Sequence, residues 1–388
     1  MIRSLYVFAR DRIYHVLMAL IAAAIYGFPS RRMTVIGITG TKGKSTAVEL
    51  LAHILESAGK KVVVSSSVRN DASGATMPRC FALERLMARG LREGAAHAVI
   101  EVTSQGVLQG RHRFIRWSAA ALTNLSPEHI EAHGGFEKYR AAKVAFFAYA
   151  AKNPRAVFFV NGGDASKAHF IRAARGRRIV EFGASDAPCP LPGAFNAYNV
   201  GAAIAIAREF GVSDSAARSG AASFAGVRGR MEYVRKEPFA AVVDYAVTPD
   251  SLKRVYEAAL PEGGKMIGVF GCTGGGRDAW KRPVMGSVAG ELCDMIVLTD
   301  DDSYDESTEK IMGEIEGGFS ADPKWRIGEN YWKIADRGEA IRKAVSLAAP
   351  GDAVVITGKG GDRWLRMARG KKIPWSDQAV VLAALAER

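Results

Sequence analysis

The glycine-rich stretch Thr39-Gly40-Thr41-Lys42-Gly43-Lys44-Ser45-Thr46 is the part of the chain best suited to chemistry. A loop of this kind directs backbone N–H groups at an anion, while a lysine reaches the β- and γ-phosphates and a hydroxyl ligates Mg²⁺. Lys44 and Ser45 occupy the two positions that do this. The strict pattern G-x-x-x-x-G-K-S/T would require glycine in place of Ile38. The stretch still predicts a phosphate-binding loop, and ATP is its first candidate ligand.

Three further stretches carry side chains suited to the same chemistry. Glu101 lies in the apolar run Ala98–Val102, and a carboxylate at the end of a buried strand must be paired or bound to metal. His129 and His133 follow the apolar run 119–122, and Lys143 lies on a helical stretch of small or apolar residues. Taken singly, each histidine is better explained as a hydrogen-bonded surface residue and the lysine as a solvated one.

The elements around the loop come in the order that phosphate binding requires. Met33–Ile38 is an apolar, β-branched run that predicts a strand. Ala47–Ala58 places its apolar residues on one helical face before Gly59 ends the helix. We therefore expect the loop to connect a buried strand to the N-terminus of a helix.

Apolar runs continue along the chain at the spacing of a mostly parallel sheet. Those of the first series are 62–64, 98–102, 119–122 and 156–160, and those of the second are 240–243, 266–270, 295–298 and 353–357. The predicted fold class is α/β, with a P-loop-type central ATPase domain at 33–228 and a Rossmann-like α/β domain at 229–388. Ligands gather at the carboxyl ends of strands in such sheets.

The composition is that of a globular protein with a basic surface. The 388 residues are 48% apolar and 24% charged, and the net charge is +13. Such a charge suits nucleotides or an anionic membrane, and no motif supports nucleic acid as a partner. Four cysteines without metal-binding spacing favour a reducing compartment, so the expected location is cytoplasmic.

Residues 1–32 predict a hydrophobic N-terminal helix flanked by arginines. The apolar part, Ile13–Phe28, has about 16 residues, fewer than the roughly 20 that a spanning helix needs. A signal peptide fits poorly because the nucleotide fold begins only a few residues later. Three interpretations stay open: a helix on the inner face of the cytoplasmic membrane, a helix docked on the protein itself, and a true span.

Together these stretches resemble the Mur ligase family, and within it the enzymes that add the third amino acid of the peptidoglycan stem peptide. The resemblance covers about positions 33 to 388 in the family's order. Its motifs are the loop 39–46, Glu101–Ser104, Thr123–Gly134, Gly193–Asn199, Gly229–Glu232, Asp244–Ala246, Gly275–Asp278, Lys281–Pro283 and Gly358–Gly360. So many ordered matches make a chance resemblance implausible.

The resemblance implies an ATP-dependent ligase of peptidoglycan precursor synthesis. A UDP-N-acetylmuramoyl-peptide carboxylate would attack the γ-phosphate to give an acyl phosphate, from which the amine of a free amino acid would displace phosphate. The implied cofactors are ATP and Mg²⁺, and the implied catalytic residues are Lys44, Glu101, His129 and Lys143. Ser45 would hold one Mg²⁺, and Glu101 and His129 would hold a second, with a carbamylated Lys143 as a further metal ligand. This agrees with the need of phosphoryl transfer for positioned cations.

Further binding residues are carried over from the same motifs. Asn196 and Asn199 would lie near the adenine, Arg230 near the phosphates and Asp244 near the ribose. Residues of the muramoyl-peptide path would be Thr76, Pro78, Thr103, Ser104 and Arg111, and those of the amino-acid pocket would be Arg277, Asp301, Asp302, Tyr304, Gly358 and Asp362. Any one of these alone would be explained equally well by loop capping or helix packing.

The amino-acid pocket departs from the family pattern. The D-N-P-R segment of diaminopimelate-adding enzymes is Asp301-Asp302-Ser303-Tyr304 here, so the arginine that would hold a second carboxylate is absent. We expect a reduced preference for diaminopimelate, and the acidic residues suit a side-chain ammonium, without a choice between lysine, ornithine and another diamine. A solvated run of charges would explain them nearly as well.

Two family histidines are replaced by Gln105 and Val247, which we interpret as variation on the substrate side. Only about 32 residues precede the ATP domain, so the family's N-terminal uridine-binding domain is expected to be missing. Two alternatives remain: a related ligase such as a folylpolyglutamate synthase, and a catalytically silent, membrane-associated ATP-binding scaffold.

Overall fold

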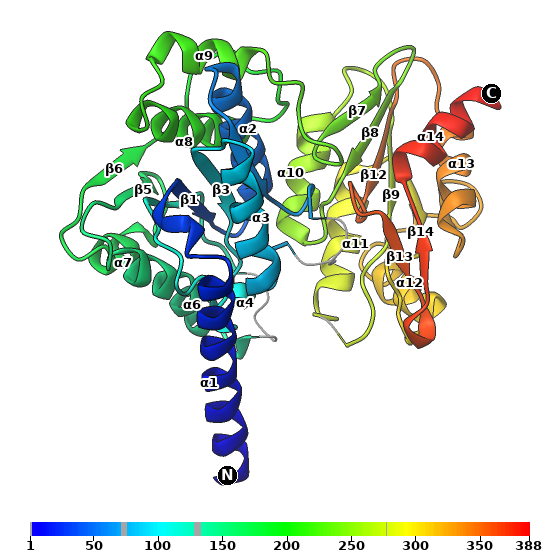
Figure 1. Cartoon of the computed structure of the whole chain (residues 1–388). Helices are drawn as coiled ribbons and strands as arrows, with labels where there is room; N and C mark the ends of the chain where they lie inside the picture. Colours follow the sequence, from blue (N-terminus) through cyan, green and yellow to red (C-terminus); the bar gives the residue numbers. More distant parts are fainter. Residues whose placement is uncertain (1, 71–75, 128–132, 277) are drawn as a thin grey trace. The chain divides into compact units, whose positions relative to one another are not determined.

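The computed structural model of the chain describes residues 2–70, 76–127, 133–276 and 278–388, and it gives side chains from residue 13 onward within those ranges. The chain divides into two compact units, Met1–Ala225 and Gly226–Arg388. Figure 1 shows a sheet with helices on both sides in each unit. The predicted α/β fold class, with a mostly parallel central sheet and a second α/β unit, is confirmed.

Unit 1 is built on a six-stranded, fully parallel sheet in the order β2-β3-β1-β4-β5-β6. Its strands are β1 (Thr34–Thr39), β2 (Val62–Ser65), β3 (His97–Glu101), β4 (Ala119–Leu122), β5 (Val157–Asn161) and β6 (Ile179–Phe182). Its helical elements are α1 (Ile2–Ile25), η1 (Pro29–Arg31), α2 (Lys44–Ser57), α3 (Cys80–Arg92), α4 (Ser104–Leu108), α6 (Phe136–Ala150), α7 (Lys167–Ala173), α8 (Asn196–Glu209) and α9 (Asp214–Ala222). Since β1 is central, both of its neighbours deliver residues to the edge where it ends.

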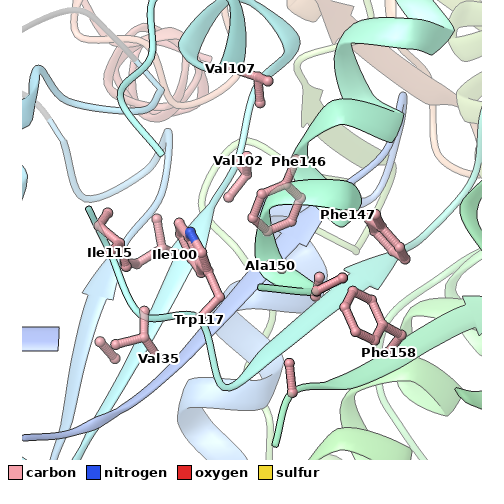
Figure 2. Close-up of a cluster of buried hydrophobic side chains, with 14 of the residues drawn as sticks. Val35, Ile100, Val102, Val107, Ile115, Trp117, Phe146, Phe147, Ala150 and Phe158 are labelled. Atoms are coloured by element: carbon pink, nitrogen blue, oxygen red, sulfur yellow. The ribbon is translucent and has the colours of Figure 1, made fainter. Parts of the chain in front are cut away.

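An aromatic core fixes α6 against the sheet of unit 1 (Figure 2). The rings of Trp117 and Phe146 meet edge to face, with centroids 4.9 Å apart. A Cβ at Gly37 would lie 2.4 Å from the Phe146 ring, so this strand residue must be glycine. Gly37 thus serves packing, while Ile38 next to it is a fully buried strand residue.

Unit 2 has a six-stranded mixed sheet in the order β11-β10-β9-β12-β8-β7, in which only the β7–β8 pair is antiparallel. The strands are β7 (Glu232–Arg235), β8 (Ala240–Asp244), β9 (Met266–Phe270), β10 (Met295–Leu298), β11 (Tyr331–Lys333) and β12 (Ala353–Thr357), with a separate ribbon of β13 (Trp364–Arg366) and β14 (Lys372–Pro374). The helical elements are α10 (Pro249–Ala259), α11 (Lys281–Leu292), α12 (Thr308–Glu316), α13 (Arg337–Leu347), η2 (Ala368–Gly370) and α14 (Asp377–Ala386). Apolar residues of β8, β9 and β12 pack with α13 and α14 to form its core.

The N-terminal helix α1 packs against α3 in unit 1. Its residues Ala19, Ala22 and Ala23 are buried, so this face is docked on the protein, as one of the three interpretations required. Throughout the part of the chain that the structure describes, no helix is long and apolar enough to cross a membrane.

Candidate active site

The glycine-rich loop connects β1 to the N-terminus of α2, as the sequence predicted. Gly40 and Gly43 have φ of 153° and 76°, where only glycine is unstrained. A Cβ at Gly43 would lie 2.2 Å from Asn199 Oδ1, and one at Gly40 would lie 1.9 Å from Thr123 Oγ1. The backbone therefore passes directly against its neighbours, and the fourteen-residue helix α2 begins at Lys44. A helix N-terminus in this setting favours an anion.

Gly43→Ala is expected to weaken ATP binding by at least about tenfold, because the new methyl group strains the backbone and displaces Asn199. Isothermal titration with ATP would measure the change. Gly59→Ala is the matched control, since Gly59 also has a positive φ of 77° but has open space around its Cα. Equal loss of affinity in both variants would show that the contact with Asn199 does not matter.

The residues after β4 hold the loop from the side. Lys42 N donates to Asn124 Oδ1 at 2.9 Å, and Asn124 Nδ2 returns a bond to Lys42 O at 3.0 Å. Thr123 Oγ1 donates to the same carbonyl at 2.7 Å. Lys44 Nζ donates to Thr41 O at 2.9 Å, which places its ammonium over the loop. The loop is thus preorganised by side chains that lie about 80 residues further along the chain.

A buried carboxylate lies behind the start of α2. Glu101, at the end of β3, is 2% exposed, and its Oε2 accepts a bond from Ser45 Oγ at 2.9 Å. The same oxygen accepts from Ser67 N at 3.0 Å, and the hydroxyls of Ser45 and Ser67 are 2.7 Å apart. Glu101 is therefore paired, as a buried carboxylate must be, and its partners are Ser45 and Ser67.

This oxygen set fits Mg²⁺. One carboxylate and two hydroxyls are hard ligands of the kind that Mg²⁺ takes, usually with several waters and substrate phosphates. Among the described residues, no three His, Cys, Asp or Glu side chains form a cluster. Ser45 and Glu101 would hold the ion. His129, predicted as a further ligand, lies outside the described residues.

Lys143 is buried beneath the loop. It lies on α6, is 1% exposed, and its Nζ donates to Gly40 O at 2.6 Å. The Nζ also lies 4.7 Å from the centre of the Tyr139 ring, whose hydroxyl is 3.2 Å from Thr41 Oγ1. The interpretation of Lys143 as a solvated helix residue is therefore wrong.

His133 is the described histidine of this region. Its Nε2 lies 3.1 Å from Ser104 Oγ, and its ring is 5.2 Å from that of Tyr139. Ser104 begins the short helix α4, and Thr103 caps it by accepting a bond from Gly106 N at 3.0 Å. Thr103 thus has a capping role, and Ser104 is connected to α6 through His133.

Three of the residues predicted to line the muramoyl-peptide path, Thr76, Pro78 and Arg111, lie near one another. This half-buried arginine donates to Met77 O and to Gln109 Oε1, and burial, with a contribution from Arg79, lowers its pKa. Met77 separates Thr76 from Pro78, and Thr76 O accepts a bond from Asn70 Nδ2 at 2.8 Å. Arg111, Thr76 and Pro78 therefore belong to one neighbourhood.

Asn196 and Asn199 lie on the first turn of α8. Asn199 Nδ2 donates to Asn196 Oδ1 at 2.8 Å, and Asn196 Nδ2 donates to Pro192 O at 2.7 Å. Both side chains are buried, and the close approach of Asn199 to Gly43 places the pair beside the phosphate loop. Their predicted proximity to bound ATP is compatible with this placement.

In unit 2, a network of buried and half-buried charges lies beyond the ends of β10 and β12. Asp302 accepts bonds from Lys359 Nζ at 2.8 Å and from an Arg366 side-chain nitrogen at 2.7 Å. Asp362 accepts from the same two side chains, at 3.3 and 2.7 Å. Burial would raise the pKa of Asp362, but Lys359 and Arg366 outweigh it and lower that pKa. Two acids and two bases thus satisfy each other.

Of the three acids predicted for the amino-acid pocket, Asp301 lies outside this network. It is 3% exposed, and its Oδ2 has no hydrogen-bond partner among the described residues. Burial raises its pKa to about 6, although Lys359 and Arg337 oppose the rise. Gly358 has a φ of 112°, and a Cβ there would lie 2.7 Å from the Asp301 carboxylate, so Gly358 makes room for it.

Arg230 and Asp244 lie at the beginning of unit 2. Asp244, at the end of β8, accepts a bond from Met231 N at 2.7 Å. The Arg230 guanidinium stacks on the Tyr245 ring at 4.3 Å. Tyr304 forms an isolated parallel β-bridge with Met367, next to the ribbon. Arg277 lies outside the described residues. These placements do not test the predicted contacts with phosphate, ribose and amino acid.

Sequence reasoning missed Ser67, Tyr139 and Arg366. Ser67 follows β2, so the rule about strand ends could have found it. Tyr139 is four residues before Lys143 on one helix face, which was also a usable signal. Arg366 lies on the three-residue strand β13, and no sequence pattern predicted this strand or its ribbon.

Comparisons with known proteins agree with this arrangement. Residues 38–188 match the Mur ligase middle domain, and residues 229–360 match the Mur ligase, glutamate ligase domain. A UDP-N-acetylmuramoyl-L-alanyl-D-glutamate--2,6-diaminopimelate ligase of Thermosynechococcus vestitus is 33% identical, over 95% of this chain and 80% of the relative. A UDP-N-acetylmuramyl-tripeptide synthetase of Roseiflexus sp. is 35% identical, over 96% and 82%.

Solved structures show the same fold. The structure of a UDP-N-acetylmuramoyl-L-alanyl-D-glutamate--2,6-diaminopimelate ligase aligns with a TM-score of 0.61 at 27% identity, over 92% of this chain and 78% of that one. A Mycobacterium tuberculosis folylpolyglutamate synthase aligns with a TM-score of 0.72 at 17% identity, over 89% and 93%, which supports the fold alone. The chain belongs to the Mur ligase family, whose members are ATP-dependent ligases that form C–N bonds.

Proposed function

We propose that the chain joins a free amino acid to the carboxylate of a UDP-N-acetylmuramoyl-peptide, using ATP, in the cytoplasm. The observation that carries the proposal is the Ser45–Glu101–Ser67 set behind a phosphate loop that Lys143 supports from below. Relatives named for this substrate class cover nearly the whole chain and support the choice.

The reaction has two steps. A substrate carboxylate oxygen bonds to the γ-phosphorus as the bond to the β-phosphate oxygen breaks, which releases ADP. The amine nitrogen then bonds to the acyl carbon, phosphate leaves with the carbon–oxygen electron pair, and the amine gives up a proton to solvent. Both steps bring anions together, so the chain must supply positive charge and fixed donors.

The residues of unit 1 have separate parts in this scheme. The loop N–H groups and Lys44 would hold the β- and γ-phosphates, and Ser45 and Glu101 would orient the metal. Bound Mg²⁺ would supply charge neutralisation between the carboxylate and the γ-phosphate. We propose that the neutral Lys143 amine adds to dissolved CO₂ and releases a proton to solvent, which gives a carbamate. His129 and this carbamate would then serve a second metal.

ADP release with UDP-N-acetylmuramoyl-dipeptide and a mixture of amino acids would test the function, with mass spectrometry of the product. We expect a product one amino acid heavier, and ADP formation that depends on both substrates. A folate acceptor in place of the muramoyl-peptide tests the folylpolyglutamate alternative. Absence of turnover with every muramoyl acceptor would contradict the proposal and favour that alternative or a silent ATP-binding scaffold.

We propose that the amino-acid substrate carries a side-chain ammonium that Asp301 binds. Asp302 and Asp362 are already neutralised by Lys359 and Arg366, whereas Asp301 is ionised above about pH 6 and has an unpartnered oxygen. A panel of lysine, ornithine and diaminopimelate should show reduced preference for diaminopimelate. Asp301→Asn should raise KM for the preferred diamine about tenfold or more, while KM for ATP stays unchanged. Diaminopimelate as the best substrate would contradict this assignment.

We also propose a peripheral membrane contact through residues 13–28, at the inner face of the cell membrane. The exposed apolar residues of α1 support it.

A further inference from the structure

Helix α1 has one covered face and one uncovered face. The covered face includes Ala19, Ala22 and Ala23, which are buried where the helix packs on α3. On the other face, Ile13, Leu17 and Leu20 are 69%, 49% and 39% exposed. At about 100° per residue these three lie within an arc of roughly 60°, opposite the alanines. We call them, with the exposed Tyr14 and Ile25 beside them, the α1 stripe.

The α1 stripe is unusual for a helix that faces water. A surface helix normally turns polar or charged residues to the solvent, yet positions 16–25 contain none. Figure 1 shows α1 (dark blue) extending beyond the rest of unit 1 toward the N-terminus, so the helix continues past the elements that cover it. A contiguous exposed apolar surface of this kind marks a site of interaction.

Exposed arginines lie after the C-terminal end of α1 and beside the turn that contains His15. The exposed Arg31 and Arg32 follow the helix, and the exposed Arg116 is next to them because its N–H donates to Ser30 Oγ at 3.1 Å. Arg113 lies beside the middle of the helix, since a Cβ at Gly110 would be 3.6 Å from the Arg113 side chain and 3.9 Å from the His15 backbone. The sequence has no Asp or Glu in 12–48 or in 102–127, so these arginines have no acidic neighbour in their own segments.

Deepening the proposed membrane contact of residues 13–28, on which it rests, we infer that the α1 stripe inserts into the headgroup boundary of a bilayer rich in anionic lipid, with these four arginines at the lipid phosphates. An apolar helix face flanked by arginines is the pattern of a helix that lies in the membrane surface. A second copy of the chain fits less well, because a two-fold contact would bring the same positive rims together. The docked alanine face keeps the helix attached to unit 1 while the opposite face binds lipid.

Sedimentation with vesicles tests this inference. The full chain is mixed with vesicles of phosphatidylglycerol and phosphatidylcholine, or of phosphatidylcholine alone, at low and high salt. We expect binding to the anionic vesicles that weakens with salt. Leu17→Glu with Leu20→Glu should lower the partition coefficient at least about tenfold, because two leucines that insertion would bury in lipid become charges. The matched control, Leu260→Glu with Leu382→Glu, makes the same changes at leucines of unit 2 that are 60% and 56% exposed, and should bind like the unmodified chain.

Circular dichroism and ATP titration of both variants show whether they fold, and the ligase assay is run on the same samples. Loss of binding without loss of turnover would separate this inference from the catalytic proposal. Equal binding of both variants, or no binding of the unmodified chain, would overturn it. Concentration-dependent self-association that only Leu17→Glu with Leu20→Glu abolishes, without vesicle binding, would assign the α1 stripe to a second copy instead.

Discussion

Lys143→Met is expected to lower kcat of the ligase reaction by about 10²- to 10³-fold, the usual effect of removing one preorganised electrostatic group. The substitution keeps the length of a side chain that is 1% exposed and removes the group that bonds to Gly40 O. Loss of its interaction with the phosphate loop should affect turnover more than KM for ATP. Steady-state ADP release measures both quantities.

Lys138→Met is the control, because Lys138 lies on the same helix α6 but is exposed. It should leave kcat unchanged. Carbon-13 bicarbonate with NMR tests the proposed carbamate, which should give a carbonyl signal that Lys143→Met removes. Full activity of Lys143→Met would refute a catalytic role, and an active, unlabelled enzyme would refute the modification alone.

Arg337→Met is expected to destabilise unit 2 by about 3–5 kcal/mol, which is the cost of breaking a buried ion pair from one side. Arg337 and Asp377 are both 0% exposed and are joined at 2.7 and 2.8 Å. Arg337 also donates to Asp300 O and Thr357 O, at 3.0 and 2.8 Å, and so connects the residues after β10 and at the end of β12. The variant leaves a buried carboxylate and two carbonyl groups without this partner.

Urea unfolding followed by tryptophan fluorescence measures the loss, since all tryptophans except Trp117 belong to unit 2. Arg342→Met on the same helix is the control, because Arg342 is 40% exposed and pairs with the exposed Glu339 and Glu387, so its loss should cost under about 1 kcal/mol. Replacing both partners, with Arg337→Met and Asp377→Leu, should restore part of the stability. If Arg337→Met and Arg342→Met cost the same, the buried pair does not hold these strands together.

Local sequence patterns were sufficient to predict much of the fold. The central strands β1, β4, β9 and β12 are continuous apolar runs, because strands buried on both faces need apolar side chains throughout. The short strands β6, β7 and β11 were missed because they lie at sheet edges and so lack a continuous apolar run. In β6, for example, three of the four residues are at most half-buried. The predicted N-terminal helix at 1–32 corresponds to α1, which the structure bounds at Ile2–Ile25.

The site was less predictable because its partners are distant in sequence. Lys143 lies in a helical stretch where a lysine is normally solvated, and nothing local indicated that its amine would bond to Gly40 O. The D-N-P-R comparison singled out Asp301 and Asp302 as pocket residues, but it could not indicate that Arg366 would neutralise Asp302. Residue types predicted which side chains could react. Which of these side chains contact each other depends on the fold, which brings distant segments of the chain together.

The strand order of unit 1 also determines when the phosphate site can form during synthesis. The loop at 40–43 depends on Glu101 through Ser45, on Thr123 and on Lys143, contacts that span 56, 81 and 103 residues of chain. Such a high contact order delays assembly until β3, β4 and α6 have left the ribosome, and closing these long loops slows folding. ATP can therefore bind only to a chain whose sheet is already paired, so nucleotide would stabilise the finished unit and would not nucleate its folding.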